Sequence, residues 1–429
     1  MIAIDVERTD ADLWAAPSNP SSHEGAEAHA LLRIDNISHI LSAYGADAAE
    51  AAIASLDLVL DRLRGRACLS WVRRPGLVEI SFEHRPSAGV EDILESLLDR
   101  LSLEPVKLMG VDLHLSLSCA VAGQALPAYV AAGDEGAWSR QYRQNMSIAA
   151  DVLAAMSDGR VHMYWQPVRS ASGGSGSLYC EALARMVDRD GRFVPPSAFI
   201  PALEALGLMR LFDRRIMAAV LDELENHPSA VLGVNISGQS ARCDIWWASL
   251  FARLKRSRGM AERLVVEITE SAALDAGAFA FVRELRALGC RVALDDFGVG
   301  HASVRRAMAI SPDIIKLDGF FLRRAAADPK NFEFLQYLVG MAGAIAPVVI
   351  VEGVETEAQS RMAAELQTRQ ASQADCWQQG YHLGRASAWR SWSYHRGGDR
   401  DVRPVSLGDL AGSRRDFRAG DGPGGLGRA

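Results

Sequence analysis

The 429-residue chain lacks the long apolar runs and the basic charge that mark two large classes of protein. No apolar run approaches the roughly 18 to 20 residues that a membrane-spanning helix needs, so we expect no membrane span. Asp and Glu outnumber Lys and Arg by 53 to 46, which gives a net charge of −7. Proteins that bind DNA or RNA usually present a basic surface, so we expect no nucleic-acid polymer as partner.

The sequence also lacks the marks of an exported protein. Residues 1–20 contain four acidic side chains and no apolar core, whereas a secretory signal has a basic start followed by an apolar stretch. The six cysteines are scattered, and none forms the Cys-x-x-Cys spacing that is common in metal and redox sites. We therefore expect a cytoplasmic protein with reduced, mostly buried thiols.

Length and hydrophobic pattern divide the chain into five segments. At roughly 150 residues per domain, the length predicts two to three domains. Residues 1–27 are expected to form a flexible leader, and residues 394–429, rich in Gly, Arg and Asp, a disordered tail. Residues 28–140 alternate short strand-like and helical runs, which predicts a smaller α+β domain. Residues 141–160 are expected to form a connecting helix, and residues 161–393 a larger domain.

The smaller domain contains three well-marked elements. Residues 48–63 are rich in Ala and Leu at helical spacing, which predicts a helix. Residues 69–82 are expected to form two strands around a turn at Pro75 and Gly76. Residues 113–122 alternate in polarity and are expected to form one further strand.

The larger domain shows a regular alternation of strands and helices. Short β-branched or apolar runs predict strands at 162–166, 178–183, 231–236, 264–269, 291–294, 314–317, 348–351 and, more weakly, 376–381. Helices are expected between them, at 211–226, 277–288 and 331–346. This order is typical of an α/β protein with a parallel sheet, and the length and strand number fit closure into a (β/α)8 barrel.

Most of these strand-like runs end in a residue that can bind a metal or transfer a proton. In a (β/α)8 barrel such positions meet at one mouth. Clustered carboxylates repel one another and lose hydration, so burying them together requires cations between them. The residues concerned are Glu181, Asn235, Glu267, Asp295 with Asp296, Lys316 and Glu352, and Gln379 can supply the last strand.

The chemistry of this set favours Mg²⁺ or Mn²⁺. Carboxylate and amide oxygens are hard ligands, and the set contains no His or Cys that would favour zinc. The adjacent acids Asp295 and Asp296 can serve two ions a few ångströms apart, an arrangement that stabilises phosphoryl transfer. Lys316 is one of only four lysines in the chain, and its compact ammonium group suits a bridging water or a phosphate oxygen.

Taken in order, these residues resemble the motifs of EAL-domain cyclic di-GMP phosphodiesterases. The resemblance covers residues 161–392 and implies a modified TIM barrel that hydrolyses cyclic di-GMP to linear pGpG, lowering the level of a bacterial second messenger. The matching motifs are Gln166-Pro167, Glu181-Ala182-Leu183 with Arg185, Asn235-Ile236-Ser237, Glu267-Ile268-Thr269-Glu270, Asp295-Asp296-Phe297-Gly298, Lys316-Leu317-Asp318, Glu352-Gly353-Val354-Glu355-Thr356 and Gln379-Gly380-Tyr381.

The resemblance implies a role for each matching residue. The residues that would hold the first metal ion are Glu181, Asn235, Glu267 and Asp295. Asp296 would help to hold the second ion, with Asp318 near it. Glu352 would act as general base, supported by Lys316, and Glu270 would brace the loop after Asp296. The residues that would contact the dinucleotide are Gln166, Leu183 and Arg185, and Gln379 and Glu355 would complete the site. The family resemblance also implies a homodimer formed through this domain.

The loop after Asp296 departs from the family pattern. Val299, His301 and Ala302 stand where the family usually has Thr, Tyr and Ser, and family members use this loop to position the second metal. This departure keeps two alternatives open. The protein could bind cyclic di-GMP as a receptor without efficient hydrolysis, or it could be a scaffold that signals through protein contacts.

The smaller domain resembles a degenerate GGDEF domain, a fold whose active members make cyclic di-GMP from GTP. Gly76-Leu77-Val78-Glu79-Ile80 occupies the position of the GGDEF motif itself. Arg33 and Val78 stand at metal-ligand positions, and Leu41 stands at a guanine-reading position. A cation cannot replace a Mg²⁺ ligand, so we expect a regulatory or structural domain, open to a protein partner, that makes no cyclic di-GMP.

Overall fold

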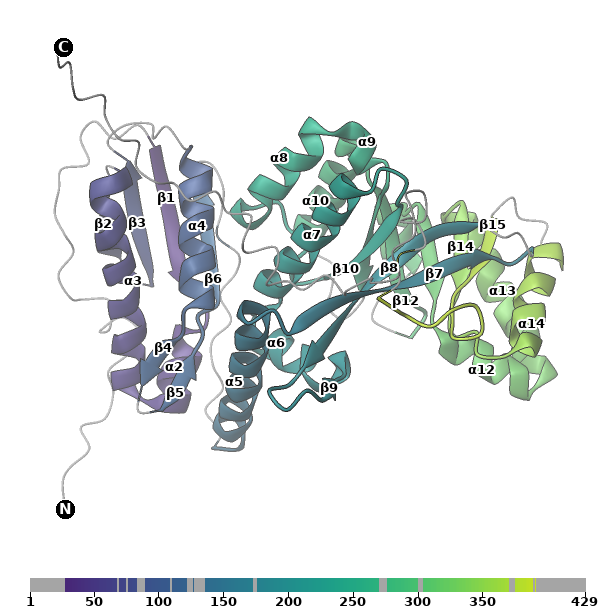
Figure 1. Cartoon of the computed structure of the whole chain (residues 1–429), viewed down its shortest axis with the longest axis horizontal. Coiled ribbons are helices and arrows are strands. Elements are labelled where there is room, and N and C mark those ends of the chain that lie inside the picture. Colours follow the sequence, from purple (N-terminus) through teal and green to yellow (C-terminus); the bar gives the residue numbers. More distant parts are fainter. Residues whose placement is uncertain are drawn as a thin grey trace, which may run out of the picture.

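A computed structural model describes the chain from residue 28 to residue 390, apart from residues 68, 75, 83–88, 109, 122–125, 127–135, 173–175, 270–275, 300–303, 370–374 and 389. The expected leader and tail lie outside the described residues. Within this range the chain forms an N-terminal sheet-and-helix unit and a C-terminal barrel (Figure 1).

The N-terminal unit is built on an antiparallel sheet with the strand order β2-β3-β1-β6. The central strand β1 is half-buried, with Leu32 and Ile34 completely inside, as a period of two predicts. The expected strand pair and helix are present as β2, β3 and α3. The elements are β1 (Ala28–Ile34), α2 (Ile37–Tyr44), α3 (Ala46–Ala67), β2 (Leu69–Arg74), β3 (Leu77–Phe82), α4 (Val90–Leu103), β4 (Val106–Leu108), β5 (Val111–Leu113) and β6 (Leu117–Val121).

One strand prediction in this unit is correct only in part. Of the expected strand at 113–122, residues 117–121 form β6 and Leu113 ends β5, and the residues between the two strands have no strand pairing. The buried side chain of Asn36 explains the interruption. Its amide donates to the carbonyl oxygen of His114 at 3.0 Å, and its oxygen accepts from the backbone N–H of Ser116 at 3.0 Å. These backbone groups are therefore satisfied by a side chain instead of a neighbouring strand.

Helix α5 (Gly136–Ser157) leads from the N-terminal unit into the barrel. It begins earlier than the expected position 141, and it packs against α2 on one side and α6 (Ile200–Leu206) on the other. Gly159 follows it with φ of 73°, a backbone conformation that favours glycine and ends the helix as expected.

Among the described residues, eight strands close the barrel, because β10 pairs with β8 and β15 pairs with β7. The strands are β7 (Val161–Ser170), β8 (Ser177–Val187), β10 (Leu232–Ser237), β11 (Leu264–Thr269), β12 (Arg291–Phe297), β13 (Ile314–Leu317), β14 (Val348–Val351) and β15 (Asp375–Gln378). The outer helices are α6, α7 (Met209–Asn226), α8 (Ala248–Arg256), α9 (Arg258–Ala261), α10 (Ala276–Leu288), α11 (Val304–Ile310), α12 (Gly319–Ala327), α13 (Pro329–Ile345) and α14 (Glu357–Arg369). The predicted (β/α)8 architecture is confirmed.

The sheet is not parallel throughout, and this part of the prediction is wrong. Strand β7 runs antiparallel to both of its neighbours, β8 and β15. Only residues 171–176 join β7 to β8, whereas a parallel crossover needs a dozen or more residues, so the two strands form a hairpin. As a result, Gln166 lies in the middle of its strand, directly opposite Glu181.

The barrel interior consists of an apolar layer with a polar layer next to it. The apolar layer is buried and is formed by Val168, Tyr179, Val265, Ala293, Ile314 and Ile350. Side chains two residues apart on a strand point to the same face, so the next inward-facing layer can be read directly from the sequence. That polar layer consists of Gln166, Glu181, Glu267, Asp295, Lys316 and Glu352.

The N-terminal unit contacts the barrel through buried polar groups. Arg214 on α7 pairs with Glu95, at 2.6 Å, and with Asp99, both on α4. The indole N–H of buried Trp246 donates to the carbonyl oxygen of Leu117 on β6 at 3.1 Å. These contacts join helix α7 and the 3-10 turn Ile245–Trp247, both beside the barrel, to the smaller unit.

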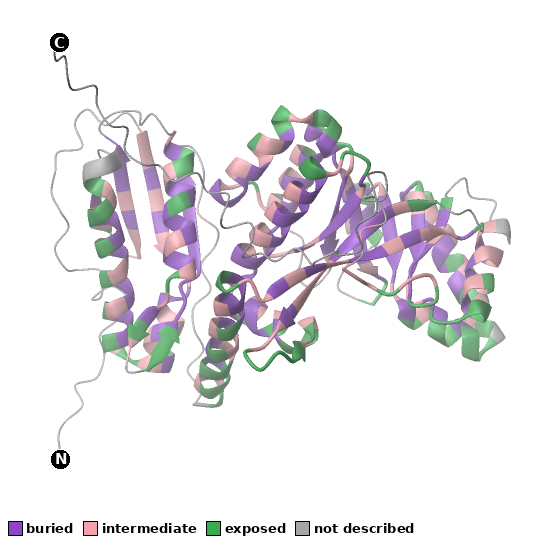
Figure 2. Cartoon of the chain, in the orientation of Figure 1, coloured by how far each residue is buried: buried purple, intermediate pink, exposed green. Residues whose placement is uncertain are grey.

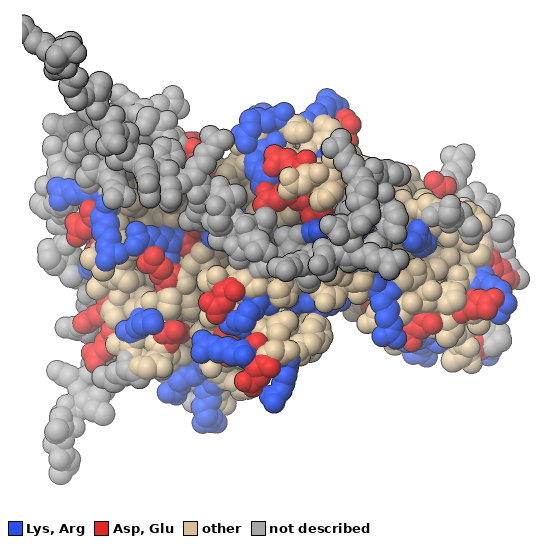
Figure 3. Space-filling model, in the orientation of Figure 1, with Lys and Arg blue, Asp and Glu red and all other residues tan. Residues whose placement is uncertain are grey.

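The surface and the thiols agree with the composition. Figure 2 shows the strands of both units largely buried and the outer faces of the helices exposed. On the face drawn in Figure 3, positive and negative side chains are interspersed. No helix in the described part of the chain is both long enough and apolar enough to cross a bilayer. Among the described cysteines, Cys243 is exposed and the others are buried free thiols.

Candidate active site

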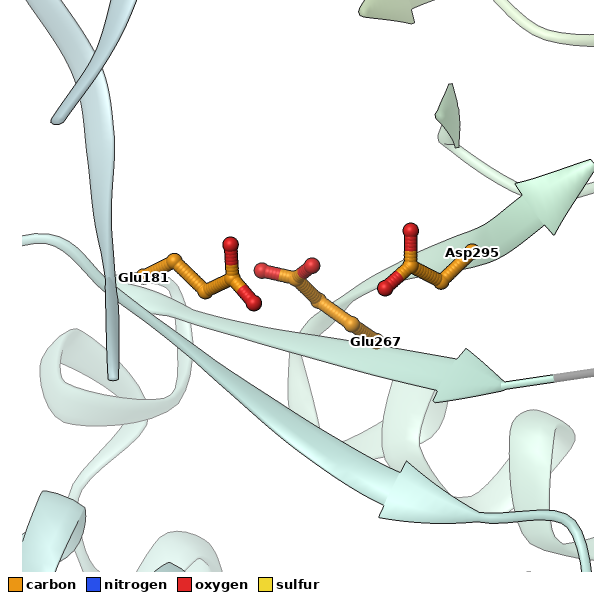
Figure 4. A group of neighbouring side chains, drawn as sticks. All are labelled: Glu181, Glu267 and Asp295. Atoms are coloured by element: carbon orange, nitrogen blue, oxygen red, sulfur yellow. The ribbon is translucent and has the colours of Figure 1, made fainter. Parts of the chain in front are cut away.

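Three buried carboxylates from different strands point toward one another in the polar layer (Figure 4). Glu181 on β8, Glu267 on β11 and Asp295 on β12 offer oxygen atoms that all lie within 4.8 Å of one another. Glu267 is 0% exposed and the other two are buried. Burying three carboxylates side by side is unfavourable unless positive charge lies between them.

Lys316 on β13 supplies positive charge at the centre of this cluster. Its Nζ lies 2.6 Å from Glu267, 2.8 Å from Glu352, 3.2 Å from Asp295 and 3.4 Å from Glu181. Lys316 is itself buried, and the four acids raise its pKa well above the usual value despite the opposing effect of burial. One ammonium group thus faces four carboxyl groups, more than its single positive charge can neutralise when all four are ionised.

Glu181 and Glu267, the two glutamates among the three buried carboxylates, differ in how easily they ionise. Burial opposes ionisation of Glu181, but Lys316 and the amides of Gln379 and Asn235 outweigh it, so its pKa lies below the usual value. The Asn235 amide donates to Glu181 at 2.5 Å. Burial raises the pKa of Glu267 well above its usual range, and Lys316 offsets this effect only in part. The amide donors at Glu181, together with the charges of Glu181 and Asp295 acting on Glu267, therefore separate the two pKa values.

A second group of acids adjoins the first. Asp295, Asp296 and Glu352 offer oxygen atoms within 4.8 Å of one another. Burial raises the pKa of Asp296 to about 6, and the charges of Asp295 and Asp318 add to this effect. Burial also raises the pKa of Glu352 to about 8, although Lys316 opposes the shift. Asp296 has φ of 55°, a left-handed conformation that is uncommon outside glycine and typical of functional sites.

The donor set fits hard divalent ions. The Oδ1 atom of Asn235 and the Oε1 atom of Glu267 are buried and accept no hydrogen bond from any residue that the structure describes, so each has a lone pair available inside the cluster. Both acidic groups consist of oxygen ligands, which Mg²⁺ and Mn²⁺ prefer. The acids outnumber the single ammonium group of Lys316, so their ionised forms attract cations. The cluster is therefore suited to divalent cations.

An open cavity of about 240 Å³ lies beside the acids. It brings together six of the residues singled out in the sequence, and it adds Tyr381, which the sequence analysis did not assign to the site. Arg185 does not line this cavity but an adjoining one of about 190 Å³, which it shares with Leu183 and Asn235. The first cavity is lined by Gln166, Glu181, Leu183, Glu352, Gly353, Glu355, Gln379, Gly380 and Tyr381.

Local hydrogen bonds fix the loops around this cavity. Gln166 donates to the carbonyl oxygen of Gly384 at 3.1 Å. The backbone N–H groups of Glu355 and Thr356 donate to the side chain of Gln359 at 2.8 and 3.0 Å. Thr356 and Gln359 form a capping box at the start of α14, which holds the exposed Glu355 at the cavity edge.

Asp318 occupies a different position from the buried acids. It caps the start of α12, where its carboxylate accepts from the N–H of Phe320 at 2.6 Å. Its charge nevertheless reaches Asp296 and contributes to the raised pKa of that residue. Glu270, His301 and Ala302 lie outside the described residues, and the described part of the loop ends at Val299, which is exposed.

Two residues that the sequence analysis did not single out shape the cluster from the adjacent layer. A Cβ atom on Gly233 would lie 2.3 Å from Oε1 of Glu267 and 2.6 Å from the ring of Tyr179. Both groups therefore occupy space that only glycine leaves open on β10. A glycine inside an otherwise apolar strand is the one sequence feature that pointed to this close approach.

Comparisons with known proteins agree with this geometry. Residues 149–386 match the family model described as the EAL domain. The probable cyclic di-GMP phosphodiesterase PdeA of Escherichia coli is 27% identical over 253 residues, which cover 58% of this chain and 33% of that protein. The cyclic di-GMP phosphodiesterase RocR of Pseudomonas aeruginosa is 28% identical over 225 residues, which cover 51% of this chain and 57% of that protein.

A solved structure supports the fold. The PaMucR phosphodiesterase in complex with c-di-GMP has a TM-score of 0.50 and 23% sequence identity, over 56% of this chain and 97% of the other. The matched region spans about a third of the length of PdeA, so the likeness concerns one domain of a longer relative. The family match covers more than half of the chain, and the protein belongs to the EAL domain family.

Proposed function

We propose that this protein hydrolyses one phosphodiester bond of cyclic di-GMP to give linear pGpG, with two divalent ions, Mg²⁺ or Mn²⁺, in the acid cluster. The observation that carries the proposal is the position of Glu181 and Glu352 in both the acid cluster and the open cavity beside it. The names of the relatives, cyclic di-GMP phosphodiesterases, support the choice of substrate.

The acids divide into two sets of ligands in this proposal. Asp296 helps to hold the second ion, and Asp318 adds negative charge nearby. Ions bound there lower the pKa of water and neutralise the charge that develops on phosphorus. The residues that hold the first ion are Glu181, Asn235, Glu267 and Asp295.

Glu352 is the general base in this proposal. The attacking water loses a proton to its carboxylate as the new P–O bond forms. The P–O bond to one ribose oxygen breaks, and that oxygen takes up a proton from solvent to leave as a hydroxyl group. Burial raises the pKa of this carboxyl to about 8, and positive charge bound beside it would lower that value toward neutral pH, where a general base works best. Lys316, 2.8 Å away, stabilises its charged form.

The remaining site residues hold the substrate and the loops. Glu355 completes the rim of the cavity, and Glu270 braces the loop after Asp296. The side chains proposed to contact the dinucleotide are Gln166, Leu183, Arg185 and Gln379.

One assay tests this function. Purified protein is incubated with cyclic di-GMP and Mg²⁺ or Mn²⁺, and pGpG is followed by chromatography. We expect pGpG to accumulate, and excess chelator to stop its formation. Full activity in excess chelator would refute the two-ion mechanism.

A second candidate function is a cyclic di-GMP receptor or scaffold that acts through protein contacts. Val299, exposed at the end of the described loop segment and lacking a hydroxyl group, favours this alternative, because the loop anchors the second ion in the family. Tight binding of cyclic di-GMP with no pGpG formed would support the receptor over the enzyme.

We also propose a homodimer, in the cytoplasm, formed through the EAL domain. Large apolar side chains are exposed on α11 and on α13: Met308 is 62%, Phe334 56% and Tyr337 70% exposed. Exposed apolar groups of this size are typical of protein interfaces. Sedimentation of the wild-type protein beside Tyr337→Glu tests this proposal, and we expect the variant to be monomeric.

The N-terminal unit is proposed to be a degenerate GGDEF-like domain that makes no cyclic di-GMP and is open to a protein partner. Arg33 stands at an expected metal-ligand position. It forms an ion pair with the carboxylate of Asp35 at 2.7 Å. Val78, at the other position, is buried and apolar. Incubation of the full chain with GTP and Mg²⁺ should yield no cyclic di-GMP.

A further inference from the structure

Arg185 lies between two aromatic rings that come from different strands. Its guanidinium carbon is 5.8 Å from the ring centroid of Tyr164 on β7 and 5.9 Å from that of Phe193 on β9 (Phe193–Val194). At about 6 Å a cation is attracted to the negative face of an aromatic ring. Phe193 is 56% exposed, so its position is not explained by burial in a core.

The strand register shows why both rings reach Arg185. Strand β8, which carries Arg185, pairs with β7 on one side and β9 on the other. Tyr164 lies opposite Leu183, and Phe193 lies opposite Val187. Each of these partners is two residues from Arg185 and on the same face of β8, so both rings are its diagonal neighbours. Aromatic and long side chains can touch across this distance.

The guanidinium is left with free hydrogen-bond donors in this position. It donates one hydrogen bond, to the carbonyl oxygen of Ala184 at 2.9 Å, and forms no ion pair with a carboxylate among the described residues. The N–H groups lie along the edge of the planar guanidinium, and apart from the one bonded to Ala184 they have no acceptor among the described residues. That edge suits an anion with several oxygen atoms, above all a phosphate.

We propose that Tyr164 and Phe193 are positioning residues that hold Arg185 ready for a phosphate group of the substrate. The inference rests on the proposed function, in which Arg185 contacts cyclic di-GMP. A free arginine side chain loses conformational entropy when it binds a ligand. Two rings that restrict it beforehand reduce this cost and strengthen binding without touching the substrate.

Steady-state kinetics and equilibrium binding test the proposal. Tyr164→Ala and Phe193→Ala should each raise KM roughly 3- to 10-fold and leave kcat within about 2-fold, the size expected for loss of one cation–π contact. Tyr164→Phe and Phe193→Tyr keep a ring and should restore the wild-type KM. Affinity for cyclic di-GMP, measured in a Glu352→Gln background that prevents turnover, should follow KM. Leu58→Ala, on the exposed surface of α3, is the control and should change neither quantity.

A double-mutant cycle separates an effect through Arg185 from direct contact with the substrate. In an Arg185→Ala background, Tyr164→Ala and Phe193→Ala should have no further effect on affinity. Undiminished effects in that background would overturn the proposal, because the rings would then bind the substrate themselves. Wild-type affinity in both alanine variants would also overturn it. A Glu352→Gln protein and a wild-type protein that both fail to bind cyclic di-GMP would instead refute the proposed function, and this inference with it.

Discussion

Lys316 shows how single residues set the charge of the site. Its one positive charge is shared by four carboxylates, all within 3.4 Å. Lys316 alone cannot neutralise four ionised carboxylates. Bound protons neutralise some of them, as the raised pKa values of Glu267 and Asp295 indicate. Divalent ions compete with these protons for the same oxygen atoms.

This competition predicts a pH-dependent metal affinity. The pKa is about 6 for Asp296 and about 8 for Glu352. Below these values the carboxyls are protonated and a metal ion must displace protons; above them they are already ionised. The apparent affinity for Mn²⁺ should therefore rise as the pH increases from about 6 to about 8, and binding should release protons. Calorimetric titrations in two buffers of different ionisation enthalpy measure both quantities. An affinity that stays constant over this range would contradict the prediction.

Glu352 and Arg185 are expected to act on different steps. Glu352→Gln keeps the shape of the side chain but removes the base, and loss of general-base catalysis typically lowers the rate by about 10² to 10⁴. Its affinity for cyclic di-GMP should change much less. Arg185→Ala should mainly weaken binding. Single-turnover rates and equilibrium affinities on the same preparations separate the two effects, and equal losses in both quantities for both variants would argue against the assigned roles.

Gly233 is expected to be necessary for metal binding. In Gly233→Ala the new Cβ would lie 2.3 Å from the carboxylate of Glu267, so this ligand must move. Affinity for Mn²⁺ should fall by at least about tenfold, the range seen when groups that support metal ligands are altered. Gly259→Ala is the matched control, because a Cβ there meets nothing within 4 Å. Circular dichroism confirms that both variants are folded, and an unchanged Mn²⁺ affinity in folded Gly233→Ala would refute the prediction.

At the scale of whole elements, the ends of helices and strands determine where the site residues stand. Strand β14 ends just before Glu352, and helix α14 begins five residues later, at Glu357. The capping box of Thr356 and Gln359 ties the start of that helix to the backbone of Glu355. The capping box therefore fixes the loop of residues 352–356 at its C-terminal end, where the loop joins α14.

Removal of this cap should destabilise the helix and loosen the loop. Gln359→Ala leaves two backbone N–H groups without their partner, and loss of a helix N-cap interaction typically costs about 1 kcal/mol. The control is Arg361→Ala, which removes an exposed ion pair with Glu357 on the same helix and should change stability by less than about 0.5 kcal/mol. Urea unfolding curves compare the variants. Equal midpoints for Gln359→Ala and wild type would show that the capping box contributes little.

At the scale of the whole molecule, the two units share a buried network of charges. Glu95 and Asp99 on α4 are buried and pair with Arg214 on α7. The same helix carries Asp213, which accepts from the backbone N–H of Ser237 at 3.0 Å, close after Asn235 on β10. Helix α7 therefore connects the N-terminal unit with the end of a strand that carries a proposed metal ligand.

Disruption of this network should be costly to the whole chain. Arg214→Met removes the arginine that pairs with both Glu95 and Asp99, although Asp99 keeps an ion pair with Arg215. Breaking a buried ion pair in this way typically costs about 3 to 5 kcal/mol. Arg258→Met removes an exposed pair with Glu262 and should cost less than about 1 kcal/mol. Denaturant unfolding curves followed by tryptophan fluorescence compare the variants with the wild type. A small effect for Arg214→Met, similar to that of Arg258→Met, would show that the contact adds little to stability.

Much of the barrel and its polar layer could be predicted from the sequence, because both depend on local periodicity. Each apolar run marked a strand, and a residue such as Glu267 or Lys316 at the polar end of a run faces inward for the same reason as the apolar residue two positions earlier. The order of the motifs then indicated which strands are neighbours. The prediction of oxygen ligands with no His or Cys follows directly from residue type.

Features that depend on pairing between distant segments were decided only by the tertiary structure. The direction of β7 follows from a short turn, and the interruption between β5 and β6 follows from Asn36, far away in the sequence. The open space at Gly233 and the two rings beside Arg185 exist because strand register brings together residues that no local pattern connects. The sequence by itself determined which chemical groups line the barrel mouth, since side-chain direction alternates along each strand. Tertiary structure decided their protonation, their spacing and their support, since burial and distance arise only when the strands close into a barrel.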